Sequence, residues 1–167
     1  MDQSIEKGRD APSLPSLPRL CWDIPVFIRG RLSGVKRRAR WVLDARPKTE
    51  YLVLVVNDIP DIVILLEAWL TQGGYRVARA YDGIQAVDAA RALRPDLILL
   101  NEMMPRLDGL GALARLRADP ATAGIKVIMH SAHPMREVAY DAGAQDFIKV
   151  PFVFKELDGM IKRVLGS

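Results

Sequence analysis

The sequence predicts an α/β fold in which a five-stranded parallel sheet is wound on both faces by helices. The first observation is a set of short runs, such as residues 97–100, that are apolar at every position, as is typical of strands buried on both faces. The second is that five strand-like runs, some of which also carry polar residues, alternate with five helical periods between residues 51 and 165. This alternation requires right-handed crossovers, and therefore a parallel sheet with helices on both sides.

The first half of this region provides two strand–helix units. Residues 51–56 form a continuous apolar run, which predicts a central strand. Pro60 fits the first position of a helix and Gly73 ends it. Residues 75–80 carry two arginines and predict an edge strand, and residues 84–93 predict an Ala-rich helix. The apolar positions that recur at the helical period in the first helix are Ile62, Leu65, Leu66, Trp69 and Leu70.

The second half repeats the alternation. Strands are expected at residues 97–101, 126–130 and 146–150. A short helix is expected at residues 135–142, because Gly143 follows it and ends the helical pattern. The two remaining helices are marked by Leu110, Leu113 and Leu116, and by Val153, Leu157, Met160, Ile161 and Val164.

Charge divides the chain into a basic arm, residues 1–48, and a domain, residues 49–167. The arm holds 11 Lys/Arg against 5 Asp/Glu, whereas the domain holds 13 against 15, so the basic character belongs to the arm. We expect the arm to be largely disordered, because its first 20 residues contain three prolines and no apolar period. Its basic cluster, Arg37, Arg38 and Arg40, could contact nucleic acid through phosphate groups. A solvated tail, or an over-extended start, explains the arm equally well.

Composition also bounds the environment and the class of activity. Cys21 is the only cysteine and cannot form an intramolecular disulfide, which is consistent with a reducing cytoplasm. No apolar stretch is long enough for a signal peptide or a membrane-spanning helix, so we expect no membrane association. No nucleophile–base pair, Gly-rich phosphate loop or metal-ligand cluster is visible, and we expect a protein that is not an enzyme.

One stretch, residues 96–109, carries the most specific pattern. A buried strand ends at Asn101, and Met104-Pro105 and Asp108-Gly109 follow at fixed spacing. This spacing resembles the third-strand motif of receiver domains in two-component response regulators, a flavodoxin-like fold with strand order 2-1-3-4-5. The resemblance covers residues 51–165. It implies that the position of Asn101 holds a phosphoryl-accepting aspartate in the family. An amide has no carboxylate oxygen that could attack phosphorus, so the acceptor is substituted here.

The resemblance also implies an acidic pair at the end of the first strand that holds Mg²⁺. Here the pair is Asn57-Asp58, and only Asp58 is charged. Mg²⁺ needs octahedral oxygen coordination, usually from one or two carboxylates plus phosphate and water. Asp58 and the Met103 carbonyl remain as direct ligands, so we expect no cofactor beyond weakly bound Mg²⁺. The alternative, which we favour over the metal, is that Asp58 caps the helix that starts at Pro60.

Three further positions complete the comparison with receivers. Ser131 matches the hydroxyl residue that bonds the phosphoryl oxygen, and without phosphate we expect its hydroxyl to bond Asn101 or water. Phe147 matches the switch aromatic, although core packing also explains an aromatic there. The family's lysine before a proline is replaced by Val150, and Lys149 lies one residue early. A one-residue offset on a strand turns a side chain to the opposite face, so Lys149 should point away from the site unless a bulge intervenes.

Two histidines flank Ser131. His130 and His133 have no cysteine and only one nearby carboxylate in the sequence, which is typical of core or loop histidines rather than of a metal site.

Three interpretations remain. We favour a receiver-like signalling protein of a bacterial two-component phosphorelay system that acts without phosphorylation, through a protein partner such as a histidine kinase or another signalling protein, or through a homodimer. The second is a conventional phosphorelay receiver that uses another acceptor, for instance Asp58 or Glu102. The third is a nucleic-acid-associated protein that acts through its basic arm.

Overall fold

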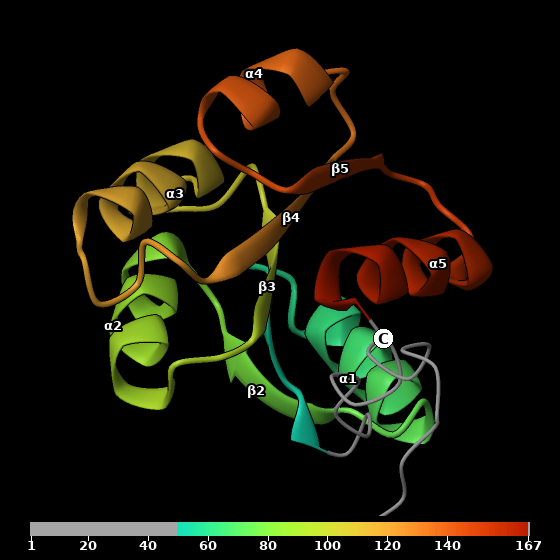
Figure 1. Cartoon of the computed structure of the whole chain (residues 1–167). Coiled ribbons are helices and arrows are strands. Elements are labelled where there is room, and N and C mark those ends of the chain that lie inside the picture. Colours follow the sequence, from blue (N-terminus) through green and yellow to red (C-terminus); the bar gives the residue numbers. More distant parts are fainter. Residues whose placement is uncertain (1–49, 167) are drawn as a thin grey trace, which may run out of the picture. The chain divides into compact units, whose positions relative to one another are not determined.

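The computed structural model describes residues 50–166, and within that range it contains one parallel sheet of five strands. The sheet order is β2-β1-β3-β4-β5, and Figure 1 shows the strands running between the helices that connect them. This order confirms the predicted flavodoxin-like fold. The strands are β1 (Leu52–Val56), β2 (Arg76–Ala80), β3 (Leu97–Asn101), β4 (Lys126–Ser131) and β5 (Asp146–Lys149).

The helices follow the strands in strict alternation. They are α1 (Pro60–Gln72), α2 (Gly83–Leu93), α3 (Gly109–Ala118), α4 (Arg136–Asp141) and α5 (Phe154–Leu165). The predicted bounds of α4 were too wide, because Met135 has non-helical backbone angles and Ala142 already forms the C-cap. Two strand ends also differ, since β4 includes Ser131 and β5 stops at Lys149.

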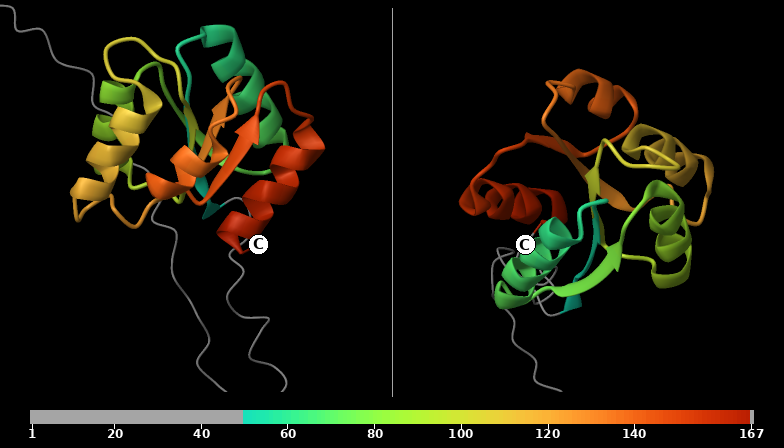
Figure 2. Two further views of the ribbon diagram at one scale, coloured as in Figure 1. Left: turned by 90° about the horizontal axis from the view of Figure 1, so that it is seen from above. Right: turned by 180° about the vertical axis from the view of Figure 1, so that it is seen from behind.

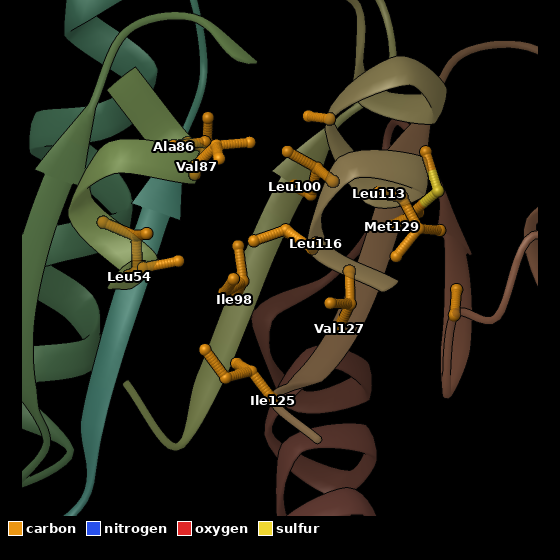
Figure 3. Close-up of a cluster of buried hydrophobic side chains, with 14 of the residues drawn as sticks. Leu54, Ala86, Val87, Ile98, Leu100, Leu113, Leu116, Ile125, Val127 and Met129 are labelled. Atoms are coloured by element: carbon orange, nitrogen blue, oxygen red, sulfur yellow. The ribbon is translucent and has the colours of Figure 1, made fainter. Parts of the chain in front are cut away.

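Two apolar cores lie on opposite faces of the sheet. Helices α2, α3 and α4 cover one face and α1 and α5 cover the other, as the view from above in Figure 2 shows. Alternation along the strands assigns each side chain to a core: Leu54 and Ile98 belong to the first, and Val53 and Leu97 to the second. Figure 3 shows the first core, where Leu113 and Leu116 of α3 face Val127 and Met129 of β4.

Aspartate–glycine pairs start α2 and α3 and fix the loop after β3. The Asp82 and Asp108 carboxylates accept hydrogen bonds from the backbone N–H groups of the first helical turns. At Gly109, a Cβ atom would lie 2.3 Å from the Asn101 carbonyl oxygen. Only glycine allows this close approach. The start of α3 therefore packs directly against the end of β3 and holds Asn101 in place.

Some expectations fall outside the described part of the chain. The basic arm and its Arg37, Arg38 and Arg40 precede residue 50, so their predicted roles stay predictions. Among residues 50–166, no helix combines the length and the apolar character that crossing a bilayer requires.

Candidate functional site

The carboxyl ends of four strands bring together four of the residues that the sequence singled out. Asn57 follows β1, Asn101 ends β3, Ser131 ends β4 and Val150 follows β5. Parallel strands place these ends at one edge of the sheet, where open α/β sheets form their binding sites. All four residues line one pocket of about 420 Å³, which we call the neutral pocket. Its lining includes residues from α1 and from the segment between β5 and α5.

The Asn101 side chain is held by two oxygens. Its Nδ2 donates to the Asp58 carboxylate oxygen Oδ1 at 3.1 Å and to the Met103 carbonyl oxygen at 2.7 Å. Both partners can only accept, so chemistry fixes the amide with its nitrogen toward them. These are the same two oxygens that the sequence proposed as direct Mg²⁺ ligands. The amide N–H₂ group therefore lies between the groups that a metal ion would need.

This donor set does not fit Mg²⁺. It offers one carboxylate and one carbonyl, and both face N–H hydrogens instead of an open coordination position. Asn57 adds no charge. Within residues 50–166, no three His, Cys, Asp or Glu side chains are grouped so that they could hold a metal ion. Weak Mg²⁺ binding stays a prediction, and any binding would require Asn101 to turn.

The favoured role of Asp58 as a helix cap is wrong. The N-cap residue of α1 is Ile59, and no side chain caps it. Instead, Asn57 Oδ1 accepts a hydrogen bond from the Ile59 N–H at 2.9 Å, which is a local Asx turn. Asn57 thus accepts the hydrogen bond of this turn. Asp58 instead accepts a hydrogen bond from the Asn101 amide at the end of a neighbouring strand. Adjacent Asn and Asp residues can both accept a local backbone hydrogen bond, so the sequence alone does not show which of the two does so.

Ser131 bonds Glu102 rather than Asn101, which corrects the sequence-based expectation. Its Oγ donates to Glu102 Oε2 at 3.0 Å and accepts from the His133 N–H at 3.0 Å. The loop after β3 explains the contact, because the Glu102 carbonyl accepts from the Gly109 N–H at 2.7 Å and its own N–H donates to the His130 carbonyl at 3.1 Å. These bonds anchor Glu102 beside the end of β4. Sequence reasoning named Glu102 only as an alternative acceptor.

Val150 and Lys149 lie on different sides of β5. The β4–β5 register is continuous up to Ser131 opposite Lys149, without a bulge. Val150 lines the neutral pocket, whereas Lys149 is exposed and lines another pocket with Phe147 and residues at the start of α4. Strand alternation predicts this placement. Phe147 is buried in the core, and the Arg136 guanidinium carbon lies 5.8 Å from its ring centroid.

His130 is a buried core residue and His133 is exposed on the following loop. The His130 ring meets the Phe152 ring edge-on, with 6.4 Å between centroids. Burial lowers the pKa of His130 to about 4, so the imidazole is neutral at pH 7. Its Nε2 atom has no hydrogen-bond partner among the described protein atoms. His130 also lines the neutral pocket, a placement that the sequence gave no signal for.

Comparison with known proteins agrees with the fold and the motif. Residues 53–162 match the family model of the response regulator receiver domain. The DNA-binding dual master transcriptional regulator RpaA of Synechocystis is 36% identical over 116 residues, which is 68% of this chain and 48% of that protein. The transcriptional regulatory protein PrrA of Mycobacterium tuberculosis is 39% identical over 114 residues, with 68% and 49% covered. The chain thus spans about half the length of these relatives.

Solved structures give the same result. The receiver domain of a sensor histidine kinase from Pseudomonas aeruginosa, which holds a magnesium ion in its active-site cleft, is 36% identical with a TM-score of 0.65. That similarity covers 70% of this chain and 98% of the other. The receiver domain of NtrX from Brucella abortus is 31% identical with a TM-score of 0.64, and 69% and 98% of the two chains are covered.

Proposed function

The chain belongs to the response regulator receiver family, and on that premise we propose that it signals without phosphorylation, through contact with a protein partner. The family assigns it a signalling role in a two-component system. The proposal goes further and concerns how the signal is carried. The observation that carries it is the Asn101 amide, whose nitrogen donates to both Asp58 and the Met103 carbonyl.

The chemistry of phosphoryl acceptance supports the proposal. An acceptor needs a nucleophilic oxygen, and the amide of Asn101 does not supply one. Transfer also needs positive charge to stabilise the phosphoryl oxygens. The donor set beside Asn101 does not fit Mg²⁺, and Val150 replaces the lysine that the family uses. The nucleophile and both sources of positive charge are thus missing from the same pocket.

The contact between Ser131 and Glu102 explains how the domain keeps one signalling conformation without a phosphoryl group. In related receivers this hydroxyl bonds the phosphoryl group. Here it donates to a carboxylate oxygen of the chain itself at 3.0 Å, and a hydrogen bond to an ionised acceptor is stronger than one between neutral groups. We infer that Glu102 holds Ser131 in a fixed position, so that no phosphoryl group is needed to order it.

The partner is a protein that recognises the receiver surface, such as a histidine kinase or another signalling protein. RpaA is described as DNA-binding, but this chain covers only 48% of that protein. We therefore do not extend the DNA binding of RpaA to this chain. We place the output in a protein contact made by the domain of residues 50–166.

A phosphodonor assay tests the proposal. The protein is incubated with acetyl phosphate and Mg²⁺, and its intact mass is measured with and without the donor. We expect no mass increase equal to one phosphoryl group. The Asn101→Asp variant is the matched control, because it restores the carboxylate with almost no change in shape, and we expect it to be labelled slowly.

Stoichiometric labelling of the unchanged chain would refute the proposal. The variants Asp58→Asn and Glu102→Gln would then identify the acceptor, since loss of labelling in one of them assigns the site. That result would establish the conventional phosphorelay interpretation with a non-standard acceptor.

A further inference from the structure

We propose that the neutral pocket binds a small uncharged molecule with an apolar body and a polar group that forms a hydrogen bond with the pocket. The proposal deepens the proposed function, on which it rests, by naming what the site takes in place of a phosphoryl group. The pocket measures about 420 Å³, which lies within the usual range of ligand sites, roughly 300 to 1,000 Å³.

The lining of the pocket selects against charge. It contains no Asp, Glu, Lys or Arg, and its polar residues are Asn57, Asn101, His130 and Ser131. His130 stays neutral at pH 7 because burial lowers its pKa to about 4. An ordered charge in such surroundings loses hydration without gaining a counter-ion. A neutral ligand avoids this loss of hydration free energy.

The polar groups of the pocket retain capacity for hydrogen bonds. Asn57 uses its Oδ1 for the Ile59 N–H, which leaves its Nδ2 as a donor. Asn101 uses its Nδ2 twice, which leaves its Oδ1 as an acceptor. His130 is 4% exposed and its Nε2 has no partner among the described protein atoms. A buried polar atom without a partner destabilises the protein, and a ligand that pairs with it recovers that loss.

The apolar part of the ligand would lie against α1 and the segment after β5. Leu65 and Ile59 line the pocket and remain about half exposed, at 55% and 49%. Apolar side chains at the mouth of a pocket gain by burial under a ligand. Ser131 lines the same pocket and bonds Glu102. An occupant would therefore touch the residue that we infer to be the fixed switch.

The test uses two fluorescent probes that share their ring systems and their N–H group. N-phenyl-1-naphthylamine is uncharged, and 8-anilinonaphthalene-1-sulfonate adds one negative charge. We expect saturable binding of the uncharged probe, and at least about tenfold weaker binding of the sulfonate, because the pocket lacks a cation. Amide chemical shifts of the full chain, with and without the uncharged probe, should change most around Asn57, Ala132 and Val150.

Neighbouring leucine and isoleucine residues on α1 provide a matched pair of variants. Leu65 lines the pocket and Ile64 does not, yet their exposure is nearly equal, at 55% and 52%. Leu65→Lys should weaken binding of the uncharged probe roughly tenfold, and Ile64→Lys less than about twofold, since only the first places a charge at the pocket. Both sites are half exposed, so both variants should fold. A second pair of variants repeats the comparison at a residue inside the pocket. Val150→Lys should weaken binding of the uncharged probe more than Val138→Lys, because Val138 is exposed and does not line the pocket.

Three results would overturn the inference. The first is no saturable binding of the uncharged probe. The second is equal binding of the two probes. The third is equal weakening by Leu65→Lys and Ile64→Lys, which would show that the exposed face of α1 binds apolar surfaces, as for a protein partner. The phosphodonor assay reports separately on Asn101, so a chain that binds no probe and takes up no phosphate overturns this inference alone.

Discussion

Asn101→Asp should make folding stability depend on Mg²⁺. The substitution keeps the shape of the side chain but replaces an N–H₂ donor by an oxygen that faces Asp58 Oδ1, now 3.1 Å from the Asn101 nitrogen. The bond to the Met103 carbonyl at 2.7 Å is lost as well. Two carboxylates at this distance repel each other unless a cation lies between them. The variant thus recreates an incomplete metal site.

The magnitude follows from the two lost bonds. A hydrogen bond to a charged acceptor is worth about 1.5–3 kcal/mol, and one between neutral groups about 0.5–1.5 kcal/mol. Solvent reaches this edge of the sheet, so the lower ends apply, and we expect a loss of about 2 kcal/mol in the free energy of unfolding without Mg²⁺. A cation at 100 times its dissociation constant adds about 2.7 kcal/mol by mass action. Mg²⁺ at that concentration should therefore recover the whole loss that comes from the two hydrogen bonds.

Urea denaturation with EDTA and with Mg²⁺ measures both effects. Asn101→Ala is the control, because it loses the same two hydrogen bonds without adding a carboxylate. It should be destabilised and should not respond to Mg²⁺. If Mg²⁺ stabilises the unchanged chain as strongly as Asn101→Asp, then Asp58 and the Met103 carbonyl already bind the ion, and the argument from the Asn101 amide fails.

Three further predictions concern the supports of the site. Burial lowers the pKa of His130 to about 4, so between about pH 6.5 and pH 4 the unfolded chain binds a proton that the folded chain does not. The free energy of unfolding should therefore fall with falling pH in that window, by up to about 3 kcal/mol, and a pH series of denaturation curves for His130→Gln should be flatter. Gly109→Ala places a Cβ 2.3 Å from the Asn101 carbonyl oxygen and should cost at least about 2 kcal/mol, measured against Gly124→Ala, which meets no atom within 4 Å. Arg117 donates to the carbonyls of residues 123, 125 and 143, so Arg117→Met should lower the thermal midpoint through a loss of about 2–3 kcal/mol; an unchanged midpoint would show that water replaces the guanidinium.

The sequence was sufficient for the elements of the fold because its signals are local. Apolar runs and Asp–Gly helix starts fix the strands and helices within a few residues. The strand order was predicted from the resemblance to receiver domains. The alternation of strands and helices shows that the sheet is parallel, but it does not give the order of the strands. The bounds of α4 were missed because six helical residues give too short a period to separate from the turns around them.

The partners of the site residues were harder to predict because they depend on distant segments. Asn101 and Asp58 are 43 residues apart, and Ser131 and Glu102 are 29 apart. No local pattern chooses between Asp58 as a cap and Asp58 as a partner of Asn101. By contrast, the placement of Lys149 away from Val150 followed from strand alternation alone. The alternation of side-chain directions along one strand is a local property of the sequence, whereas a hydrogen bond between the ends of two strands depends on distant residues.

The substitutions at the sheet edge compensate one another. With an aspartate at Asn101, Asp58 would need a cation. With a lysine at Val150, that lysine would need the missing carboxylate, because the lining of the neutral pocket contains no other acid. As the chain stands, the Asn101 amide pairs with Asp58 and Met103, and Glu102 pairs with Ser131. Each polar group left by the missing charges thus has a partner or faces the pocket. Restoring one charged side chain by itself would leave that charge without a partner. The neutral residues of the site therefore stabilise the protein jointly, and the effects of reverting them one at a time should not add.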